Sequence, residues 1–313
     1  MNKRQKETLI RKTNHMVCFD CPMSRYTTMR VGGKAEALYM AEDLHTLREL
    51  IRFLSAEQIP YITIGKGSNI LVQDKGLDGL VILLGGALAD IKMERQNHPC
   101  NETSTVDPVV FAGGGLSIAG FLSYCTTHAI GGGEFLAGIP GTIGGAAAMN
   151  AGAQGREIES IVKNIEVMDT HGNIVVKERP ELDFGYRELS LEKGAMILKV
   201  GLNLHTEAKE IVRTRIRENQ LTRKESQPLE YASAGSVFKN PPGDYAARLI
   251  DEIGLKGKQI GGAMISQKHA NFIVNVGGAR TDDILALMDL ARREVKRQKG
   301  IELETEIRVI GRG

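Results

Sequence analysis

The sequence contains no uninterrupted apolar run of about 18 residues, the length that a membrane-spanning helix requires. A strong charge of one sign is also lacking. The net charge is only +2 at pH 7, so neither nucleic acid nor a membrane surface is expected as a partner. The basic N-terminus, residues 1–16, is not followed by an apolar segment and does not resemble a signal peptide. We therefore expect a cytoplasmic protein.

Cysteine is scarce, with Cys18, Cys21, Cys100 and Cys125 as the only four. Cys18 and Cys21 form a single C-x-x-C pair, whereas a zinc ribbon needs two such pairs, so no metal site is expected. Reduced thiols are usual in the cytosol, and we predict that state here. A redox or metal-binding role of the pair is the alternative.

Several nucleotide-binding and hydrolase signatures are missing. The P-loop pattern occurs nowhere in the chain, and the Rossmann pattern G-x-G-x-x-G is absent from the glycine-rich residues 131–155. The segment around Ser236 is not the G-x-S-x-G of an α/β-hydrolase. Glycine itself is abundant, at 36 residues, but without the period of collagen. Its clusters beside expected strands and helix starts suggest backbone that closely approaches a ligand.

The length of 313 residues predicts two or three structural units, with a boundary near Thr222. Apolar periodicity and capping residues predict helices at 43–58, 117–128, 206–225, 245–253 and 281–299. Strands are expected at 61–64, 70–72, 80–84, 109–112, 196–204, 272–276 and 303–310, and a hairpin at 161–176. Residues 226–240 are expected to form a loop.

Two glycine-rich loops are candidates for binding a phosphate. Residues 138–145, GIPGTIGG, precede an expected helix whose free N–H groups could face a pyrophosphate. The alternative is a tight helix contact that needs small residues. Residues 65–69, GKGSN, could form an anion-binding nest or an ordinary β-turn. Both loops in one chain favour a dinucleotide cofactor.

Four polar side chains are candidates for chemistry. Ser236, after Gly235, could donate a proton to a carbanion, or its segment could be a polar loop that caps the helix from Asp244. Arg187 could bind a carboxylate in bidentate fashion, or lie on the surface. Glu306 lies on an expected C-terminal strand whose polar face is either solvent-exposed or part of a cleft. For His269, a structural hydrogen bond is the more usual role than catalysis.

Seven segments, in this order, resemble the UDP-N-acetylenolpyruvoylglucosamine reductase (MurB) family, and the resemblance extends from about Thr27 to Gly311. They are TTMRVGG, GKGSN, GIPGTIGGAAAMNAGA, FGYR, SAGSVFKNP, IGGAMISQKHANFIVN and LETEI. The resemblance implies a mixed α/β and α+β protein. An FAD-binding fold of the vanillyl-alcohol-oxidase (PCMH) type would occupy 1–85 and 86–221 as two subdomains. A C-terminal α+β substrate-binding domain would cover 222–301, and 302–313 would return a strand to the active site.

The same resemblance implies the reaction and its residues. Hydride would pass from NADPH through bound FAD to the methylene carbon of an enolpyruvyl ether, and a proton to the neighbouring carbon. Ser236 resembles the proton donor, and Arg187 and Glu306 the groups that stabilise the intermediate. Glu306 would have to be protonated for this, or position Ser236 or a water. Expected cofactor-binding residues are Gly65, Lys66, Gly67, Ser68, Asn69, Gly138, Pro140, Gly141, Gly145, Asn150, Ala151 and Gly152. Expected substrate-binding residues are Tyr186, Arg223, Asn240 and Arg308.

The chain has no room between Arg187 and Ser236 for the added tyrosine loop that one group of these enzymes carries, so it is similar to the shorter, type II group. We expect a monomer that acts on a small nucleotide sugar. Three other functions are weighed against this one: a different flavoenzyme of the same fold, a non-catalytic nucleotide-sugar sensor, and a C-x-x-C thiol oxidoreductase.

Overall fold

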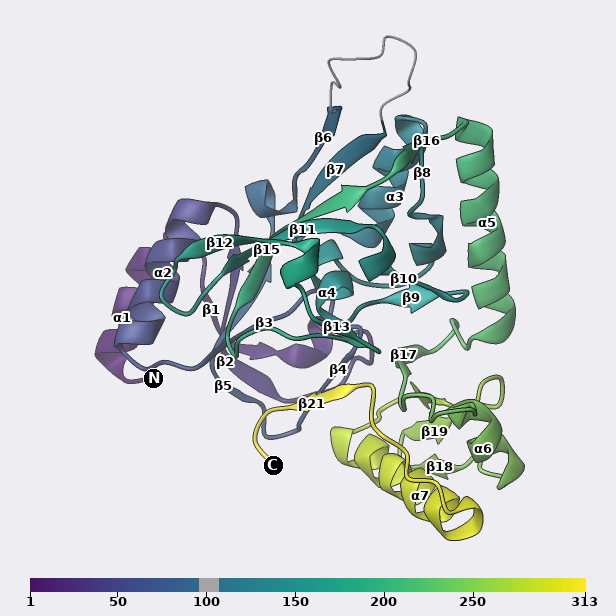
Figure 1. Ribbon diagram of the computed structural model, residues 1–313. Helices are drawn as coiled ribbons and strands as arrows, with labels where there is room; N and C mark the ends of the chain where they lie inside the picture. The colour runs from purple at the N-terminus through teal and green to yellow at the C-terminus, as the bar shows by residue number, and fades with distance from the viewer. Residues whose placement is uncertain (96–106) are drawn as a thin grey trace. The chain divides into compact units, whose positions relative to one another are not determined.

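The computed structural model describes residues 1–95 and 107–313 (Figure 1). The chain folds into two compact units. The first consists of Met1–Cys18, Leu38–Gly65 and Leu80–Thr222, and the second of Phe19–Ala37, Lys66–Gly79 and Arg223–Gly313. The four domain ranges expected from the sequence divide the chain differently and stay a prediction. In the described part of the chain, no helix is long and apolar enough to cross a membrane.

A five-stranded antiparallel sheet forms the centre of the first unit, with the strand order β12-β11-β15-β7-β6 (Figure 1). The strands are β6 (Ile91–Arg95), β7 (Pro108–Gly113), β11 (Val162–Met168), β12 (Ile174–Glu178) and β15 (Met196–Asn203). The hairpin of β11 and β12 confirms the expected turn, since Asp169 accepts hydrogen bonds from the backbone of His171 and Asn173.

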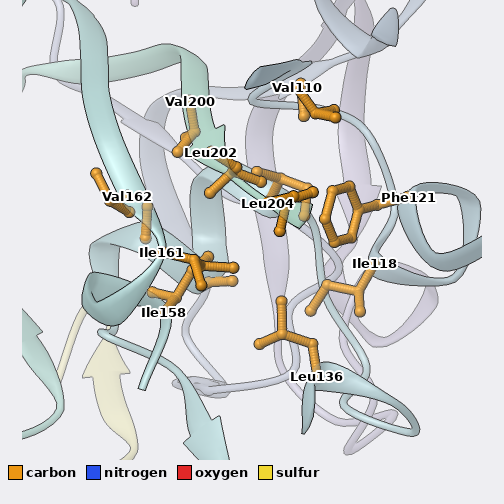
Figure 2. Close-up of a cluster of buried hydrophobic side chains, with 14 of the residues drawn as sticks. Val110, Ile118, Phe121, Leu136, Ile158, Ile161, Val162, Val200, Leu202 and Leu204 are labelled. Carbon is orange, nitrogen blue, oxygen red and sulfur yellow. The ribbon is translucent and has the colours of Figure 1, made fainter. Parts of the chain in front are cut away.

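Helices α3 (Ile118–Thr127) and α4 (Ile143–Ala148) contribute to the hydrophobic core of this unit, together with the sheet. Figure 2 shows this core, in which Phe121 lies near Leu204, the residue that follows β15. Ser117 caps α3 as expected, because its side chain accepts a hydrogen bond from the N–H of Gly120 at 3.0 Å. This core supports the glycine-rich segment that follows α3.

The N-terminal part of the first unit holds α1 (Lys3–Lys12), which the sequence analysis did not predict, and α2 (Leu44–Ala56), which it did. Asp43 caps α2, accepting from the N–H of Thr46 at 2.8 Å. In this part, β3 (Tyr61–Thr63) runs parallel to β5 (Leu77–Leu84). Two further strands, β1 (Cys18–Pro22) and β2 (Lys34–Ala41), contain residues of both units.

Short strand pairs connect the larger elements. They are β8 (Ile130–Gly131) with β16 (His205–Thr206), β9 (Gly152–Ala153) with β10 (Arg156–Glu157), and β13 (Phe184–Gly185) with β14 (Glu188–Leu189).

The second unit combines a four-stranded antiparallel sheet, of order β17-β20-β19-β18, with two helices and one parallel strand pair. The sheet strands are β17 (Ala232–Ser236), β18 (Gln259–Ile260), β19 (Ala263–Ile265) and β20 (Phe272–Asn275). The helices are α6 (Ala246–Glu252) and α7 (Thr281–Lys299), and the parallel pair is β4 (Ile70–Val72) with β21 (Arg308–Ile310). A second hydrophobic core, centred on residues such as Phe238, Leu287 and Ile307, holds these elements together.

Three secondary-structure predictions were wrong. Thr206 does not cap the long helix, because it pairs with Ile130 in β16 and α5 (Lys209–Ser226) begins three residues later. Residues 226–240 are not only loop, since they contain β17. The last strand is confined to β21, and the preceding residues make only an isolated bridge between Phe238 and Thr305.

The prediction of reduced thiols was wrong for Cys18 and Cys21, which are both disulfide-bonded. In a regularly extended strand, residues three apart point to opposite faces. Asp20, between the two cysteines, has φ +53°, so the strand is not regularly extended there and the rule does not apply to Cys18 and Cys21. Cys125 is a free, buried thiol, and Cys100 lies outside the described residues.

Candidate functional site

In the first unit, the start of the short helix α4 is packed against the protein itself. The N–H of Ile143 donates to the carbonyl of Leu116 at 2.8 Å, and that of Gly144 to the carbonyl of Gly114 at 3.0 Å. Gly145 donates to the side chain of Thr142 at 3.2 Å. The expectation that these N–H groups are free for a pyrophosphate is therefore wrong at residues 143–145. The alternative, a close contact that needs small residues, describes this helix start.

Gly65, the first residue of the GKGSN loop, nevertheless lies close to the second glycine-rich segment within this unit. A Cβ atom on Gly65 would lie 2.7 Å from the hydroxyl oxygen of Thr142, and one on Gly145 would lie 3.3 Å from the same atom. Thr142 thus lies between two glycines that carry no side chains, Gly65 and Gly145. Such bare backbone lets a flat, elongated ligand approach closely. That these loops hold a dinucleotide cofactor stays a prediction.

Asn150, expected to bind the cofactor, is fully buried and is engaged inside the protein. Its side-chain amide donates to a carboxylate oxygen of Glu157 at 2.8 Å and to the carbonyl of Gly185 at 3.0 Å. Its amide oxygen accepts from the N–H of Glu159 at 3.2 Å. At nearby Gly152, a side chain would overlap the carbonyl oxygen of Arg156. Asn150 and Gly152 therefore shape the hairpin of β9 and β10.

Arg187 lies in the turn between β13 and β14, where its backbone has φ +61°, an uncommon conformation for a residue with a side chain. Its guanidinium pairs with the carboxylate of Glu157 at 3.5 Å. The ring centroid of Tyr186 lies 5.2 Å from the central carbon of the guanidinium. These contacts hold a cationic side chain that is 22% exposed, so Arg187 is accessible but constrained.

In the second unit, Gly67 and the TTMR segment are interlocked. Gly67 has φ +62°, and a Cβ there would overlap the carbonyl oxygen of Tyr26. The N–H of Thr28 donates to the carbonyl of Gly67 at 3.2 Å, and the Thr28 hydroxyl donates to the carbonyl of Ser233 at 2.7 Å. Thr28 therefore ties the loop that holds Gly67 to β17. The boundary between the two units falls inside the GKGSN loop, after Gly65.

Ser236 lies at the end of β17, where the pairing with β20 is irregular. Ser233 is opposite Val274 and Ser236 is opposite Phe272, with a register shift between the two pairs. Gly235, inside this bulge, has φ +77°, which glycine adopts without strain. Bulges of this kind re-aim a side chain next to functional sites. The bulge therefore sets the direction of Ser236.

Glu306 is held beside the Ser236 segment by backbone hydrogen bonds. Its N–H donates to the carbonyl of Val237, the residue after Ser236, at 2.8 Å. The side-chain amide of Asn69, a residue of the GKGSN loop, donates to the carbonyl of Glu306 at 3.0 Å. The structure thus brings together three segments that are far apart in the sequence and that supply Asn69, Ser236 and Glu306.

The expected substrate contacts fall in different places. Arg308 begins β21, and its N–H donates to the carbonyl of Asn69 at 3.0 Å. Arg223 belongs to the last turn of α5. The side-chain oxygen of Asn240 accepts from the N–H of Ala246 at 3.1 Å and so supports the start of α6. Tyr186 is 45% exposed. The structure brings Arg308 close to Asn69, whereas Asn240 serves a helix start.

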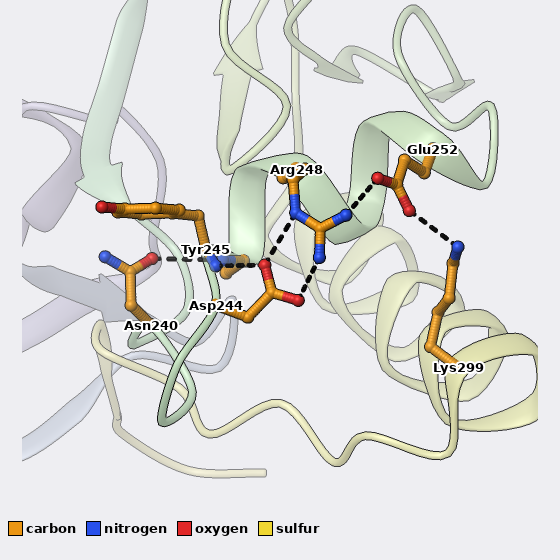
Figure 3. A network of polar contacts seen from close by, with 7 residues as sticks. Asn240, Asp244, Tyr245, Arg248, Glu252 and Lys299 are labelled. Atoms are coloured by element: carbon orange, nitrogen blue, oxygen red, sulfur yellow. Dashed lines mark hydrogen bonds and ion pairs between the residues drawn. The ribbon is translucent and has the colours of Figure 1, made fainter.

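Figure 3 shows the polar network next to Asn240. Arg248 of α6 forms ion pairs with Asp244 and Glu252, and Glu252 also pairs with Lys299 of α7 at 2.7 Å. The hydrogen bond from Arg248 holds the pKa of Asp244 below its usual value. These groups lie at the surface, and the network joins α6 to α7 rather than forming a reactive centre.

Asn271 has a role that the sequence analysis missed. This buried side chain accepts from the N–H of Phe238 at 3.0 Å and donates to the carbonyl of the same residue at 2.8 Å. It therefore clamps the backbone two residues after Ser236. Asn271 lies in the HANF segment, in which the sequence analysis considered only His269. Nδ1 of His269 is buried without a hydrogen-bond partner in the described structure, and burial lowers its pKa, so the structural hydrogen bond considered for His269 is not made through Nδ1.

Comparison with known proteins assigns a class to this arrangement. Residues 35–177 match the model of an FAD-binding domain, and residues 227–310 match the C-terminal domain of UDP-N-acetylenolpyruvoylglucosamine reductase. The protein is an FAD-dependent oxidoreductase with the FAD-binding and C-terminal domains that the sequence resemblance implied. The expected fold class and the FAD cofactor are confirmed.

Relatives extend this match over nearly the whole chain. A UDP-N-acetylenolpyruvoylglucosamine reductase of Heliobacterium modesticaldum is 43% identical over 292 residues, covering 93% of this chain and 89% of the relative. One of Syntrophus aciditrophicus is 40% identical and covers 98% and 96%. The crystal structure of the Thermus caldophilus enzyme (MurB) matches with a TM-score of 0.77 at 36% identity, covering 94% of this chain and 98% of that one. The chain belongs to the UDP-N-acetylenolpyruvoylglucosamine reductase family.

Proposed function

We propose that this protein reduces the enolpyruvyl ether of UDP-N-acetylglucosamine to UDP-N-acetylmuramate, with NADPH as the electron donor, as a cytoplasmic step of peptidoglycan synthesis. The observation that carries the proposal is the joining of the Ser236 and Glu306 segments by the 2.8 Å hydrogen bond between Glu306 and Val237, in a chain of this family. FAD, when bound, supplies the hydride chemistry between NADPH and substrate. We further propose that the enzyme acts as a monomer on a small nucleotide sugar, without nucleic acid.

Three side chains are proposed to act on the substrate. Ser236 donates the proton to the carbon next to the one that accepts the hydride, and the bulge before Ser236 redirects its side chain. Arg187 stabilises the negative charge that develops toward the substrate carboxylate, where a guanidinium held in place contributes most. Glu306 assists as a protonated acid or by positioning Ser236 or a water. Tyr186, Arg223, Asn240 and Arg308 are proposed to contact the substrate.

The residues proposed to hold FAD include the glycine-rich loops whose bare backbone meets at Thr142. They are Gly65, Lys66, Gly67, Ser68, Asn69, Gly138, Pro140, Gly141, Gly145, Asn150, Ala151 and Gly152. For Asn150 and Gly152 the contribution is the shape of the hairpin rather than a direct side-chain contact, since Asn150 is occupied by Glu157 and Gly185.

An anaerobic absorbance spectrum tests the proposal. We expect flavin bands that bleach on addition of NADPH and return on addition of UDP-N-acetylglucosamine enolpyruvate. A protein that is reduced by NADPH but not reoxidised by this substrate would be a related flavoenzyme with another substrate. A protein that takes up no FAD would contradict the proposal altogether.

A further inference from the structure

Arg187, the proposed carboxylate-binding residue, is kept in position by other residues. It lies in the turn between β13 and β14 and has a left-handed backbone conformation. Such a conformation costs free energy and persists only where the surrounding structure holds it in place. The ion pair with Glu157 at 3.5 Å joins the turn to the hairpin of β9 and β10. A long cationic side chain at such a turn would otherwise sample many rotamers.

Glu157 is in turn held by the buried part of the protein. Asn150, with no exposed surface, donates to one carboxylate oxygen of Glu157 at 2.8 Å, and the other carboxylate oxygen faces Arg187. The second hydrogen bond from the Asn150 amide, to the carbonyl of Gly185, fixes the chain two residues before Arg187. The buried Asn150 side chain thus positions both the carboxylate that pairs with the Arg187 guanidinium and the backbone just before Arg187.

The electrostatics of the Glu157–Arg187 pair agree with a role of the pair other than stabilising the fold. Burial raises the pKa of Glu157, although the Arg187 charge and the Asn150 hydrogen bond act in the opposite direction. A partly buried pair is therefore maintained at a desolvation cost, which a solvent-exposed pair would not bear. Neighbouring Glu159 instead pairs with Arg179 at 2.9 Å.

We propose that Glu157, oriented by Asn150, is a positioning residue that aims Arg187 at the substrate carboxylate. This inference rests on the proposed function. Glu157 touches neither substrate nor cofactor in this role and acts only through Arg187. Its removal leaves the guanidinium present but misaligned, so binding and reaction of the carboxylate-bearing substrate suffer while reduction by NADPH does not.

The experiment measures, by stopped flow, the reduction of the enzyme by NADPH and its reoxidation by the enolpyruvyl substrate. For Glu157→Gln, which keeps the shape and loses the charge, we expect reoxidation slowed roughly 10- to 100-fold, as for other misplacements of a catalytic group. NADPH reduction, FAD content and the thermal midpoint stay unchanged. Glu157→Asp, which keeps the charge, recovers part of the rate. Glu159→Gln, the matched control, changes neither half-reaction.

A double-mutant cycle with Arg187→Ala separates positioning from a general structural role. If Glu157 acts through Arg187, Glu157→Gln has no further effect in the Arg187→Ala background. Equal slowing in both backgrounds, or loss of FAD content in Glu157→Gln and Glu157→Asp alike, would overturn the inference. If Arg187→Ala slows reoxidation but Glu157→Gln does not, the inference alone is wrong. If Arg187→Ala leaves reoxidation unchanged, the proposed role of Arg187 fails together with it.

Discussion

The N–H of Glu306 donates to the carbonyl of Val237 at 2.8 Å, so a residue of the last segment of the chain is fixed one position away from Ser236. The side chain of Asn271 holds the backbone of Phe238, the next residue, with two hydrogen bonds. The Ser236 segment is thus the meeting point of two distant stretches of sequence. Its geometry depends on hydrogen bonds that individual substitutions can remove.

Replacing Ser236 by alanine tests the proton donation directly. We expect Ser236→Ala to leave reduction by NADPH fast and to slow reoxidation by the substrate, since only the second half-reaction needs the proton. A positioned proton donor contributes about 10²- to 10⁴-fold, which sets the expected size of the loss. Stopped-flow absorbance measures both steps. Ser233→Ala, on the other side of the bulge, is the control, and equal slowing of both half-reactions would contradict the proposed role.

Replacing Asn271 by alanine should affect stability and reoxidation together. The substitution leaves a buried N–H and a buried carbonyl of Phe238 without partners, at a cost of about 1–3 kcal/mol for each unsatisfied group. Urea unfolding measures the stability, and stopped flow measures the displacement of Ser236 as slower reoxidation. Asn173→Ala, in an exposed hairpin turn, serves as the control. Unchanged stability of Asn271→Ala would show that the clamp is dispensable.

The stability of the protein should depend on pH through His269. Burial lowers the pKa of this side chain from its ordinary value of 6.5, so the folded state keeps it neutral while the unfolded state takes up a proton. The contribution of neutral His269 to the free energy of unfolding is therefore fully present above the pKa of the unfolded state and is lost progressively as the pH falls below that pKa. Urea unfolding at pH 7.5 and 5.5 would reveal a decrease that is smaller in His269→Gln. An identical decrease in both proteins would assign the effect to other groups.

The state of the cysteines can be read by alkylation and mass spectrometry. We expect Cys18 and Cys21 to react only after reduction, because both are disulfide-bonded. Burial raises the pKa of the Cys125 thiol to about 12, so it should react only when the protein unfolds. Disulfides are rare in the cytosol, so labelling in intact cells tests the proposed location as well. Cys18→Ser and Cys21→Ser should keep the reductase activity, whereas its loss would favour the thiol-oxidoreductase alternative.

Local features were predictable from the sequence and long-range polar contacts were not. Ser117 is the cap expected from its position, and Asp43, where another expected helix begins, caps α2 in the same way, since a cap depends on residues three positions away. Thr206 had the same appearance but pairs in β16, because tertiary pairing outweighs local preference. The family resemblance identified the FAD-binding domain and the C-terminal domain, while the site residues that it implied stay a prediction. The hydrogen bond from Asn150 to Gly185 spans 35 residues, and no local pattern encodes it.

The contact between Gly65 and Thr142 predicts a substitution that acts on the cofactor. A Cβ at Gly65 would lie 2.7 Å from the Thr142 hydroxyl oxygen, so Gly65→Ala must push apart two loops that are proposed to hold FAD. We expect the purified variant to retain less FAD and to bind added FAD more weakly, measured by absorbance and by fluorescence titration. Gly185→Ala, where a Cβ meets open space, should retain FAD like the unaltered protein.

Removing the obstructing hydroxyl distinguishes this clash from a loss of backbone flexibility. The second substitution, Thr142→Ala, deletes the atom that the new Cβ meets, although it also removes the acceptor for the N–H of Gly145. If steric overlap is the cause, Gly65→Ala with Thr142→Ala binds FAD more tightly than Gly65→Ala alone, so the two effects are non-additive. Simple addition of two losses would mean that Gly65 is needed for another reason. The contact with Thr142 would then not be what makes glycine necessary at this position.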